Sequence, residues 1–274
     1  MYRIRIISLL LISLAGCSQF KFFYFNADYL IESTVEDYLS LSEEDRSELR
    51  SNIGLLLNWH QNEMLLHYAE FLDKQIPNFE KSSLNKKQII EAVSDARVLF
   101  LATLEGAAPF IANVLERHTS KEKIAHLAAR LKEKEQEDLQ SASSNTIDET
   151  EKRAKIKSNF ERFMGNLNKT QLNAIDSYIE ATEEYRFYLY NRRVERREKL
   201  LILLQQNPSK DDIEIFLVGL FSDNPRDTVS EKWWAHFTNL LIEVSKSIEQ
   251  NQLDELSRSF SAYSADMKAL IRKK

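Results

Sequence analysis

The sequence predicts an all-α protein, folded as a multi-helix bundle or an elongated helical array. Glycine (5 residues) and proline (4 residues) punctuate turns and strands, and both are scarce in a chain of 274 residues. Apolar residues recur at three- and four-residue spacing, while no segment shows the polar–apolar alternation that is typical of strands. Hydrophobic residues make up 43% of the chain and charged residues 29%, so a core can form beneath a well-solvated surface.

The first half of the chain is expected to hold five helices, each bounded by a capping residue or a proline. Their ranges are 28–39, 43–75, 86–103, 109–118 and 121–138. Ser42 and the acids after it suit the start of the second helix, because a hydroxyl and negative charge satisfy the free N–H groups there. We expect Pro77 to end that helix and Pro109 to start a later one, since proline removes a backbone hydrogen bond within a helix.

The second half is expected to hold five more helices. Their ranges are 148–167, 170–205, 210–221, 231–250 and 253–272. The longest, 170–205, follows a heptad-like spacing without a break until Pro208. Ser230 is an expected N-cap, and Trp233 and Trp234 open the helix that follows it. We expect at least one of these tryptophans to pack in the core, while the other could mark a contact patch.

Residues 141–147 (SASSNTI) are small and polar, as is typical of a linker. They divide the body into an N-terminal helical lobe (28–140) and a C-terminal helical lobe (148–274). The alternative is one continuous domain.

The N-terminus predicts export followed by attachment to a membrane. Two arginines precede an apolar run from Ile6 to Leu14, which has the length of a signal h-region and is too short to span a bilayer, since a spanning helix needs roughly 20 residues. The sequence Leu-Ala-Gly16-Cys17 follows and resembles the lipobox of bacterial lipoproteins. The resemblance implies cleavage between Gly16 and Cys17, removal of signal peptide 1–16, and lipid on the Cys17 thiol. Two or more acyl chains would anchor the protein stably.

The residues after the cysteine indicate which membrane the protein is attached to. In Gram-negative bacteria, an Asp after the lipidated cysteine resembles an inner-membrane retention signal, and Ser18 stands there instead. We therefore expect an outer-membrane protein that faces the periplasm, with the inner membrane as the weaker alternative. Residues 17–27 form an aromatic-rich tether that is either a belt at the membrane interface or an extended segment packed on the body.

Composition limits the partners and the chemistry. The net charge of -5 disfavours nucleic acid, because binding by counterion release needs a basic surface. Cys17 is the single cysteine, so disulfides are not expected. No Gly-x-Ser-x-Gly motif or glycine-rich phosphate loop is present, and we expect no catalytic residue, cofactor or metal.

Two clusters are candidate sites. The first combines arginines with tyrosines on the helix 170–205, and its members are Tyr185, Arg186, Tyr188, Arg192, Arg193, Arg196 and Arg197. Planar guanidinium groups suit carboxylate or phosphate, so the cluster could contact an anionic envelope component or an acidic partner. The alternative is pairing with acids on neighbouring helices, which is usual for charge-laced helix faces.

The second cluster is a weaker polar site formed by His60, Glu63 and His67, which an α-helix would place within about a 60° arc. These side chains could ligate zinc, but the two histidines lie two turns apart, which is too far for one tetrahedral ion. The alternative is a polar seam where another helix crosses.

Three stretches of the chain also carry a family resemblance. They are 24–28 with Asp37, Tyr38 and Leu41; 59–63 with Tyr68, Ala69, Phe71 and Leu72; and Ile175 with Arg192, Arg193, Arg196 and Arg197. Together with the lipobox they resemble an uncharacterised family of Gram-negative lipoproteins, known only as a domain of unknown function. The resemblance implies a helical fold and an envelope address, and it supplies no catalytic residue.

These observations lead to one expected function and two alternatives. We expect a membrane-anchored, non-enzymatic binding or scaffolding protein of the cell envelope, attached through its N-terminal lipid. The first alternative is an envelope-acting hydrolase that uses a Glu/His pair such as Glu63 and His60. The second is a cytosolic helical tether that retains residues 1–16.

Overall fold

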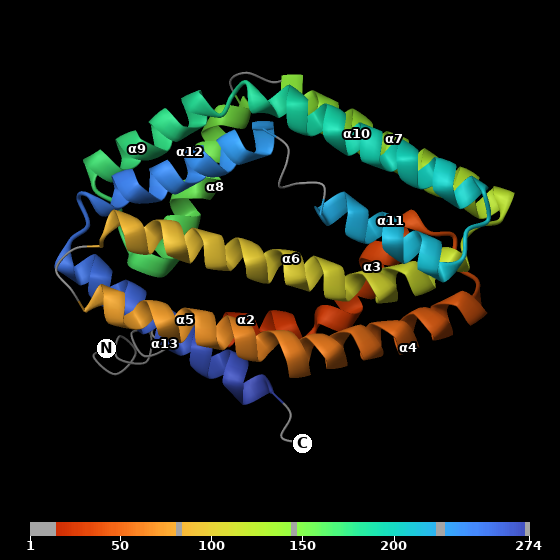
Figure 1. Ribbon diagram of the computed structural model, residues 1–274, viewed down its shortest axis with the longest axis horizontal. Helices are drawn as coiled ribbons and strands as arrows, with labels where there is room; N and C mark the ends of the chain where they lie inside the picture. Colours follow the sequence, from red (N-terminus) through yellow and green to blue (C-terminus); the bar gives the residue numbers. More distant parts are fainter. Residues whose placement is uncertain (1–14, 81–83, 144–146, 223–227, 272–274) are drawn as a thin grey trace, which may run out of the picture.

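The computed structural model describes residues 15–80, 84–143, 147–222 and 228–271. All regular structure in these ranges is helical, which confirms the all-α prediction (Figure 1). The elements are α2 (Ala15–Phe25), α3 (Ala27–Tyr38), α4 (Glu43–Trp59), the π-helix η1 (His60–Met64), α5 (Leu65–Phe79), α6 (Lys86–Glu116), α7 (Lys121–Ser143), α8 (Ile147–Met164), α9 (Lys169–Ala181), α10 (Tyr185–Gln205), α11 (Lys210–Ser222), α12 (Thr228–Ser245) and α13 (Gln250–Leu270).

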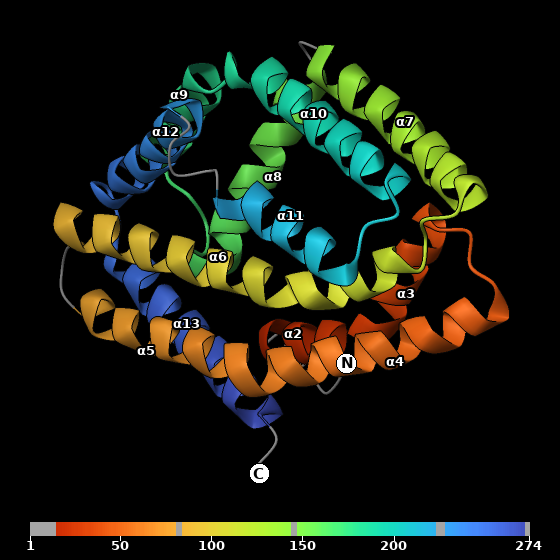
Figure 2. The ribbon, with the colours of Figure 1, turned by 45° about the vertical axis from the view of Figure 1, so that its right-hand side comes forward.

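The helices form an elongated array around the long central helix α6 (Figures 1 and 2). Helices α4, η1 and α5 form one continuous rod along an edge, and α13 packs against its α5 half. Helices α7 and α10 pair along the opposite edge, and α11 packs against α6. Helices α9 and α12 pair at one end, where α8 also packs against α9 and α13.

Two clusters of buried side chains hold this array together. The first is formed by α3, α6, α7, α10 and α11, with Leu204 and Ile213 fully buried. The second is formed by α8, α9 and α12 around Ile175 and Leu240. Burial of apolar surface of this kind is the dominant favourable contribution to folding.

Helix α6 is long and apolar enough to cross a membrane, as judged by length and composition alone. In the structure it packs against α4, α5, α11 and α12, and it is the axis of the helical body.

The predicted boundaries at two prolines were wrong. Pro109 lies inside α6, which runs unbroken where two helices were expected, and Pro77 lies in the last turns of α5 rather than beyond its end. Packing compensates at Pro109, because Ala108 and Ala112 on either side are fully buried in the first core. Only two residues of α5 follow Pro77, so the helix does end close to this proline.

The predicted single helix over 170–205 is broken at 182–184, and α9 and α10 run in different directions (Figure 1). The Thr182 hydroxyl donates to the carbonyl of Tyr178 at 2.8 Å, and its backbone N–H bonds the same carbonyl at 3.1 Å. Side-chain bonds of threonine to the preceding turn bend helices. The heptad-like pattern continues through this break, which is why spacing alone did not predict it.

Of the two predicted N-caps, one is confirmed and one is wrong. Ser42 forms a full capping box with Asp45, as expected. Ser230 was wrongly predicted as an N-cap, because α12 begins at Thr228 and Ser230 lies within its first turn. Its hydroxyl instead accepts a hydrogen bond from Arg192.

The segment between α7 and α8 is shorter than the predicted linker 141–147, because α7 extends to Ser143 and α8 begins at Ile147. Residues 144–146 lie outside the described ranges. Several helix pairs join the two predicted lobes, including α5 with α13, α6 with α11 and α7 with α10. Contacts between helices therefore connect residues 28–140 with residues 148–274 at several places.

Candidate functional site

The segment that follows the predicted cleavage point is a helix docked on the body. Residues 1–14 of the predicted signal peptide lie outside the described ranges, and the backbone of Gly16 and Cys17 lies in the first turn of α2. Helix α2 packs against α13, where Lys21 forms an ion pair with the buried Asp266 at 2.8 Å. The Tyr24 hydroxyl lies 3.3 Å from Nδ1 of His60. The tether is therefore neither extended nor detached from the body.

The other face of the same segment is apolar and uncovered. Phe22, Phe23, Phe25 and Tyr29 are each at least 60% exposed. Phe22 and Phe23 contact each other edge to face, with ring centroids 5.9 Å apart. Residues 17–27 were expected to be extended if packed on the body, and that was wrong: most of the segment is helical, with one face packed on the body and an aromatic face directed outward.

His60, Glu63 and His67 do not converge. The π-helix η1 contains His60 and Glu63, and its wider turn changes the angular phase from which the common arc was inferred. The half-buried ring of His60 packs among Tyr24, Trp59 and Tyr68.

Burial lowers the pKa of His60 below its ordinary value. Glu63 and His67 are exposed, and His67 pairs instead with Glu70 at 3.6 Å. In the described ranges, no group of three or more His, Cys, Asp and Glu side chains is placed to hold a metal ion.

The arginine cluster makes several bonds to neighbouring helices. Arg193 and Arg197 both approach Asp138 of α7, at 3.4 and 2.7 Å. Arg196 donates to the carbonyl of Leu220 in α11 at 3.0 Å. These bonds tie α10 to α7 and α11, as expected for the structural alternative.

Other members of the cluster also face α12. Arg192 donates to the Ser230 hydroxyl at 2.6 Å. The hydroxyl of the buried Tyr185 lies 3.4 Å from Nε2 of His236. Tyr188 is half-buried beside them on α10. The cluster is therefore largely engaged with the protein itself, although Arg186 and Arg193 also line a cavity.

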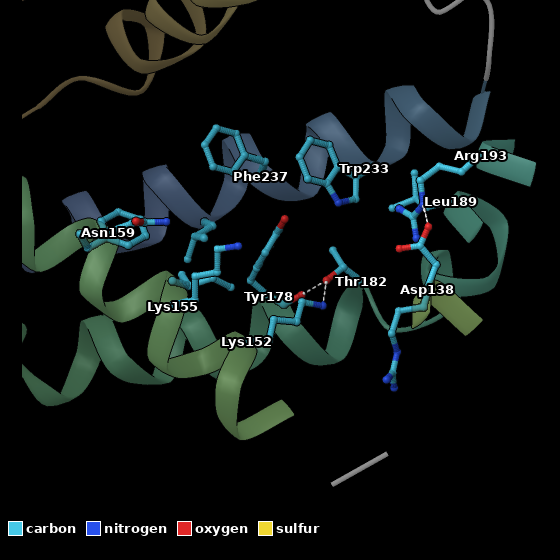
Figure 3. A pocket seen from close by; sticks show the side chains of 14 residues that line it. Asp138, Lys152, Lys155, Asn159, Tyr178, Thr182, Leu189, Arg193, Trp233 and Phe237 are labelled. Carbon is cyan, nitrogen blue, oxygen red and sulfur yellow. Dashed lines mark hydrogen bonds and ion pairs between the residues drawn. The ribbon is translucent and has the colours of Figure 1, made fainter. Parts of the chain in front are cut away.

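This polar cavity lies between α8, α9, α10 and α12 and has a volume of about 460 Å³ (Figure 3). Four basic side chains line it, and Asp138 is the only carboxylate among its lining residues; the basic residues are Lys152, Lys155, Arg186 and Arg193. Trp233 and Phe237 of α12 form an apolar wall, with their rings stacked at 6.0 Å and an interplanar angle of 4°.

A second, apolar cavity of about 630 Å³ lies between α5, α6, α8, α12 and α13. Its lining consists mainly of Phe, Leu, Ile, Val and Ala side chains, and none of its lining residues is charged. Trp234 lies at this cavity, and Arg97 stacks over its ring at 4.9 Å. Trp233 and Trp234 therefore line different cavities, and both are half-buried.

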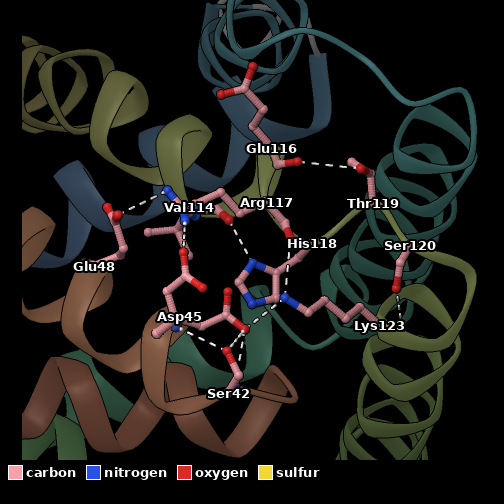
Figure 4. A network of polar contacts seen from close by, with 11 residues as sticks. Ser42, Asp45, Glu48, Val114, Glu116, Arg117, His118, Thr119, Ser120 and Lys123 are labelled. Carbon is pink, nitrogen blue, oxygen red and sulfur yellow. Dashed lines mark hydrogen bonds and ion pairs between the residues drawn. The ribbon is translucent and has the colours of Figure 1, made fainter.

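A buried polar network forms a third candidate (Figure 4). Asp45 accepts hydrogen bonds from Lys123 at 2.8 Å and from the Ser42 hydroxyl at 2.8 Å. Burial alone would raise the pKa of Asp45, but these bonds outweigh it and hold that pKa well below its usual range. His118 lies beside them and its Nδ1 donates to the Val114 carbonyl at 2.7 Å.

The neighbouring space in this network is about 10 Å³, which is room for about one water molecule. The network therefore links α4, α6 and α7, and the space beside it is too small for a ligand.

The sequence did not single out Lys152, Lys155 or Tyr178 as site residues, because they lie on two helices that only the fold brings together. Trp233 and Trp234 were the one sequence feature that pointed to these cavities, because each of them lines one.

Comparison with known proteins gives a family and no assigned activity. No curated protein matches the chain, and no solved structure matches it either. A family of unknown function, DUF6279, matches residues 37–223. Helices α2, α12 and α13 lie outside the matched region. Because the match covers more than half of the sequence, the chain belongs to the DUF6279 family of unknown function.

Proposed function

We propose that the protein is a lipoprotein anchored through Cys17 to the outer membrane, facing the periplasm, with a non-enzymatic binding or scaffolding role in the envelope. The observation that carries this proposal is the two-faced helix α2. One face is fixed to the body by Lys21 and Tyr24, and the other presents exposed aromatic rings close in sequence to Cys17. Phenylalanine side chains on the apolar face of a helix are favourable at the boundary between lipid headgroups and acyl chains.

This arrangement supports a body held close to the lipid surface. Acyl chains on Cys17 would enter the bilayer, and Phe22, Phe23 and Phe25 would meet the interface beside them. Because α2 also packs against α13, the anchor would restrict the orientation of the helical body. A partner in the periplasm would then meet a defined face of the protein.

The first experiment is the intact mass of the full chain purified from membranes, compared with a Cys17→Ala variant. We expect a mass that corresponds to residues 17–274 plus lipid, and an unprocessed 1–274 chain for the variant. Separation of inner from outer membranes on a density gradient then tests the location. An unprocessed mass for the unaltered chain would refute the anchor and favour a cytosolic helical tether.

The binding role is tested separately, by crosslinking in intact cells followed by purification. We expect an envelope protein or an anionic envelope component to be enriched above an unrelated lipoprotein with the same anchor. Equal recovery from both would refute a scaffolding role. For the hydrolase alternative, no observation favours Glu63 and His60 as a pair, because Glu63 is exposed and His60 packs among aromatic rings.

A further inference from the structure

The polar and apolar cavities adjoin each other. Asn159 and Phe160 of α8 and Phe237 of α12 line both of them. The two adjoining spaces therefore offer basic side chains in one and an apolar lining in the other. Each cavity alone has a volume within the range of small-molecule sites, which is about 300–1,000 Å³.

The charge at the polar end favours an anion. Of its four basic residues, Lys155 is exposed and forms no ion pair with any residue that the structure describes. Arg193 pairs with Asp138 at 3.4 Å, and Arg186 pairs with Glu183 at 2.6 Å. The lining itself carries four cations and one carboxylate, and Lys155 is the cation placed to meet an incoming anion. A negatively charged group entering the cavity would meet a net positive surface.

Tyr178 adds a hydrogen-bond donor at the same place. Its side chain is only 9% exposed, and its hydroxyl has no hydrogen-bond partner among the described residues. Figure 3 shows this side chain pointing into the cavity toward Trp233 and Phe237. The hydroxyl is accessible from the cavity rather than enclosed in the core, so it can donate to an acceptor that enters there.

Burial raises the pKa of Tyr178 to about 12. The hydroxyl therefore keeps its proton at every physiological pH, and it remains available as a donor.

We propose that one single-chain amphiphile with an anionic headgroup occupies both adjoining cavities and passes between them beside Phe160 and Phe237. The acyl chain lies in the apolar cavity between α5, α6, α12 and α13, and the headgroup lies beside Lys155 and Tyr178. Lys155 and Asn159 are one helical turn apart on α8, so the headgroup and the start of the chain follow the same helix face. A fatty acid and a monoacyl phospholipid share this chemistry.

This inference assigns a ligand class to the binding role proposed above, and it does not depend on whether Cys17 carries lipid. The intact-mass measurement tests the anchor and cannot report on the cavities. Failure of one proposal is therefore distinguishable from failure of the other.

The test uses the full chain in phosphatidylcholine vesicles and a 12-carbon fatty acid that carries a diazirine near its methyl end. After irradiation, labelled peptides are identified by mass spectrometry. We expect labels on α5, α6, α12 or α13 at residues that line the apolar cavity. Labels confined to α2 or to other surface helices would overturn the proposal.

Competition then identifies the headgroup. Palmitate and a monoacyl phosphatidylglycerol represent the two sources, and hexadecanol is the uncharged comparison. One of the two anionic lipids should compete strongly for the labelled site. We expect Lys155→Glu to weaken its competition about fivefold and to leave competition by hexadecanol unchanged. Lys132→Glu, at an exposed lysine of α7 without an ion pair among described residues, is the matched control. An equal effect of both variants, or no effect of Lys155→Glu, would overturn the headgroup assignment.

A second variant tests the chain. Ala92 of α6 lines the apolar cavity, so Ala92→Trp reduces the room for methylene groups. Each methylene that is excluded should weaken competition about fourfold, so the loss should grow with chain length from octanoate to palmitate. The competitor also partitions into the vesicles, but it does so equally with variant and unaltered protein. This partitioning therefore cancels when the strength of competition is compared between the two proteins.

Ala129→Trp on the exposed face of α7 is the matched control for this substitution. Thermal melts of all four variants show whether each is folded. A loss that does not depend on chain length in folded Ala92→Trp would overturn the placement of the acyl chain.

Discussion

Gly106 is placed where a single added methyl group tests the packing of α4 against α6. A Cβ atom at this position would lie within 2.9 Å of three carbons of the Trp59 ring. The ring cannot move away easily, because Phe110 and His60 pack against it with centroid distances of 5.9 and 6.2 Å. Gly106→Ala therefore forces α4 and α6 apart or rotates the indole.

The expected magnitude follows from two opposing effects. Replacing glycine by alanine within a helix stabilises it by about 1 kcal/mol. Overpacking of a close contact costs about 1–3 kcal/mol, and we expect the upper end because three ring atoms are affected. Gly106→Ala should then lower the free energy of unfolding by about 2 kcal/mol.

Gly54 of α4 provides the matched control, because a Cβ there has no neighbour within 4 Å. Gly54→Ala should raise the free energy of unfolding by about 1 kcal/mol, through helix propensity alone. Urea unfolding followed by circular dichroism measures both variants under the same conditions. The two substitutions are chemically identical, so the difference of about 3 kcal/mol isolates the contact with Trp59.

A double-mutant cycle checks the cause. Trp59→Leu removes the ring, so Gly106→Ala in that background should lose most of its destabilising effect. If Gly106→Ala stabilises the unaltered protein as much as Gly54→Ala does, the close approach of α4 and α6 at this point is refuted.

Three further predictions follow from buried polar groups. Burial lowers the pKa of His118 below its ordinary value of 6.5, so the folded state binds fewer protons than the unfolded one. The stability contributed by the neutral ring is full above pH 6.5 and falls as the pH drops below it, and His118→Gln should flatten this dependence in melts from pH 7 to pH 5. Gln171 and Gln252 bond each other through both amides at 2.8 and 3.0 Å, so Gln171→Leu should lower the free energy of unfolding by about 1–3 kcal/mol, because it removes both of these buried hydrogen bonds. Lys21→Met leaves the buried carboxylate of Asp266 without its ion-pair partner, so α2 should detach more often and be cleaved faster in limited proteolysis.

Each of these predictions has an outcome that contradicts it. An unchanged pH slope in His118→Gln would mean that the buried ring is not a source of acid sensitivity. Additive losses for Gln171→Leu and Gln252→Leu would show that the two amides do not interact. Equal protease resistance of α2 in Lys21→Met would place its attachment elsewhere.

Element type could be predicted well from the sequence, while element boundaries could not. Apolar periodicity and capping residues such as Ser42 are local features, and local features were enough to predict the helices from residue 28 onward. Pro109 misled the prediction because its backbone penalty is local, whereas the compensating burial of Ala108 and Ala112 is tertiary. The break at Thr182 was missed for a related reason, since the pattern of apolar residues continues through it.

The same distinction between local and tertiary information applies to the candidate sites. Residue type identified the arginines of α10 as candidate anion-binding groups, but only the fold shows Arg197 bonded to Asp138 and Arg196 bonded to the end of α11. The arc proposed for His60 and Glu63 assumed regular α-helical geometry, and the π-helix removed that assumption. Lys155 and Tyr178 meet at one cavity because α8 and α9 pack side by side.

The sequence by itself determined that this chain is helical, that its surface is acidic overall, and that a lipobox-like motif precedes an aromatic segment. These properties depend on residue type and on spacing within a few turns. Tertiary structure alone decided that the aromatic segment is a docked helix with one exposed face and that two cavities lie side by side at Phe160 and Phe237. The physical reason is that a cavity or an exposed face is defined by which distant helices pack together, and that packing depends on the shapes of all the side chains at once.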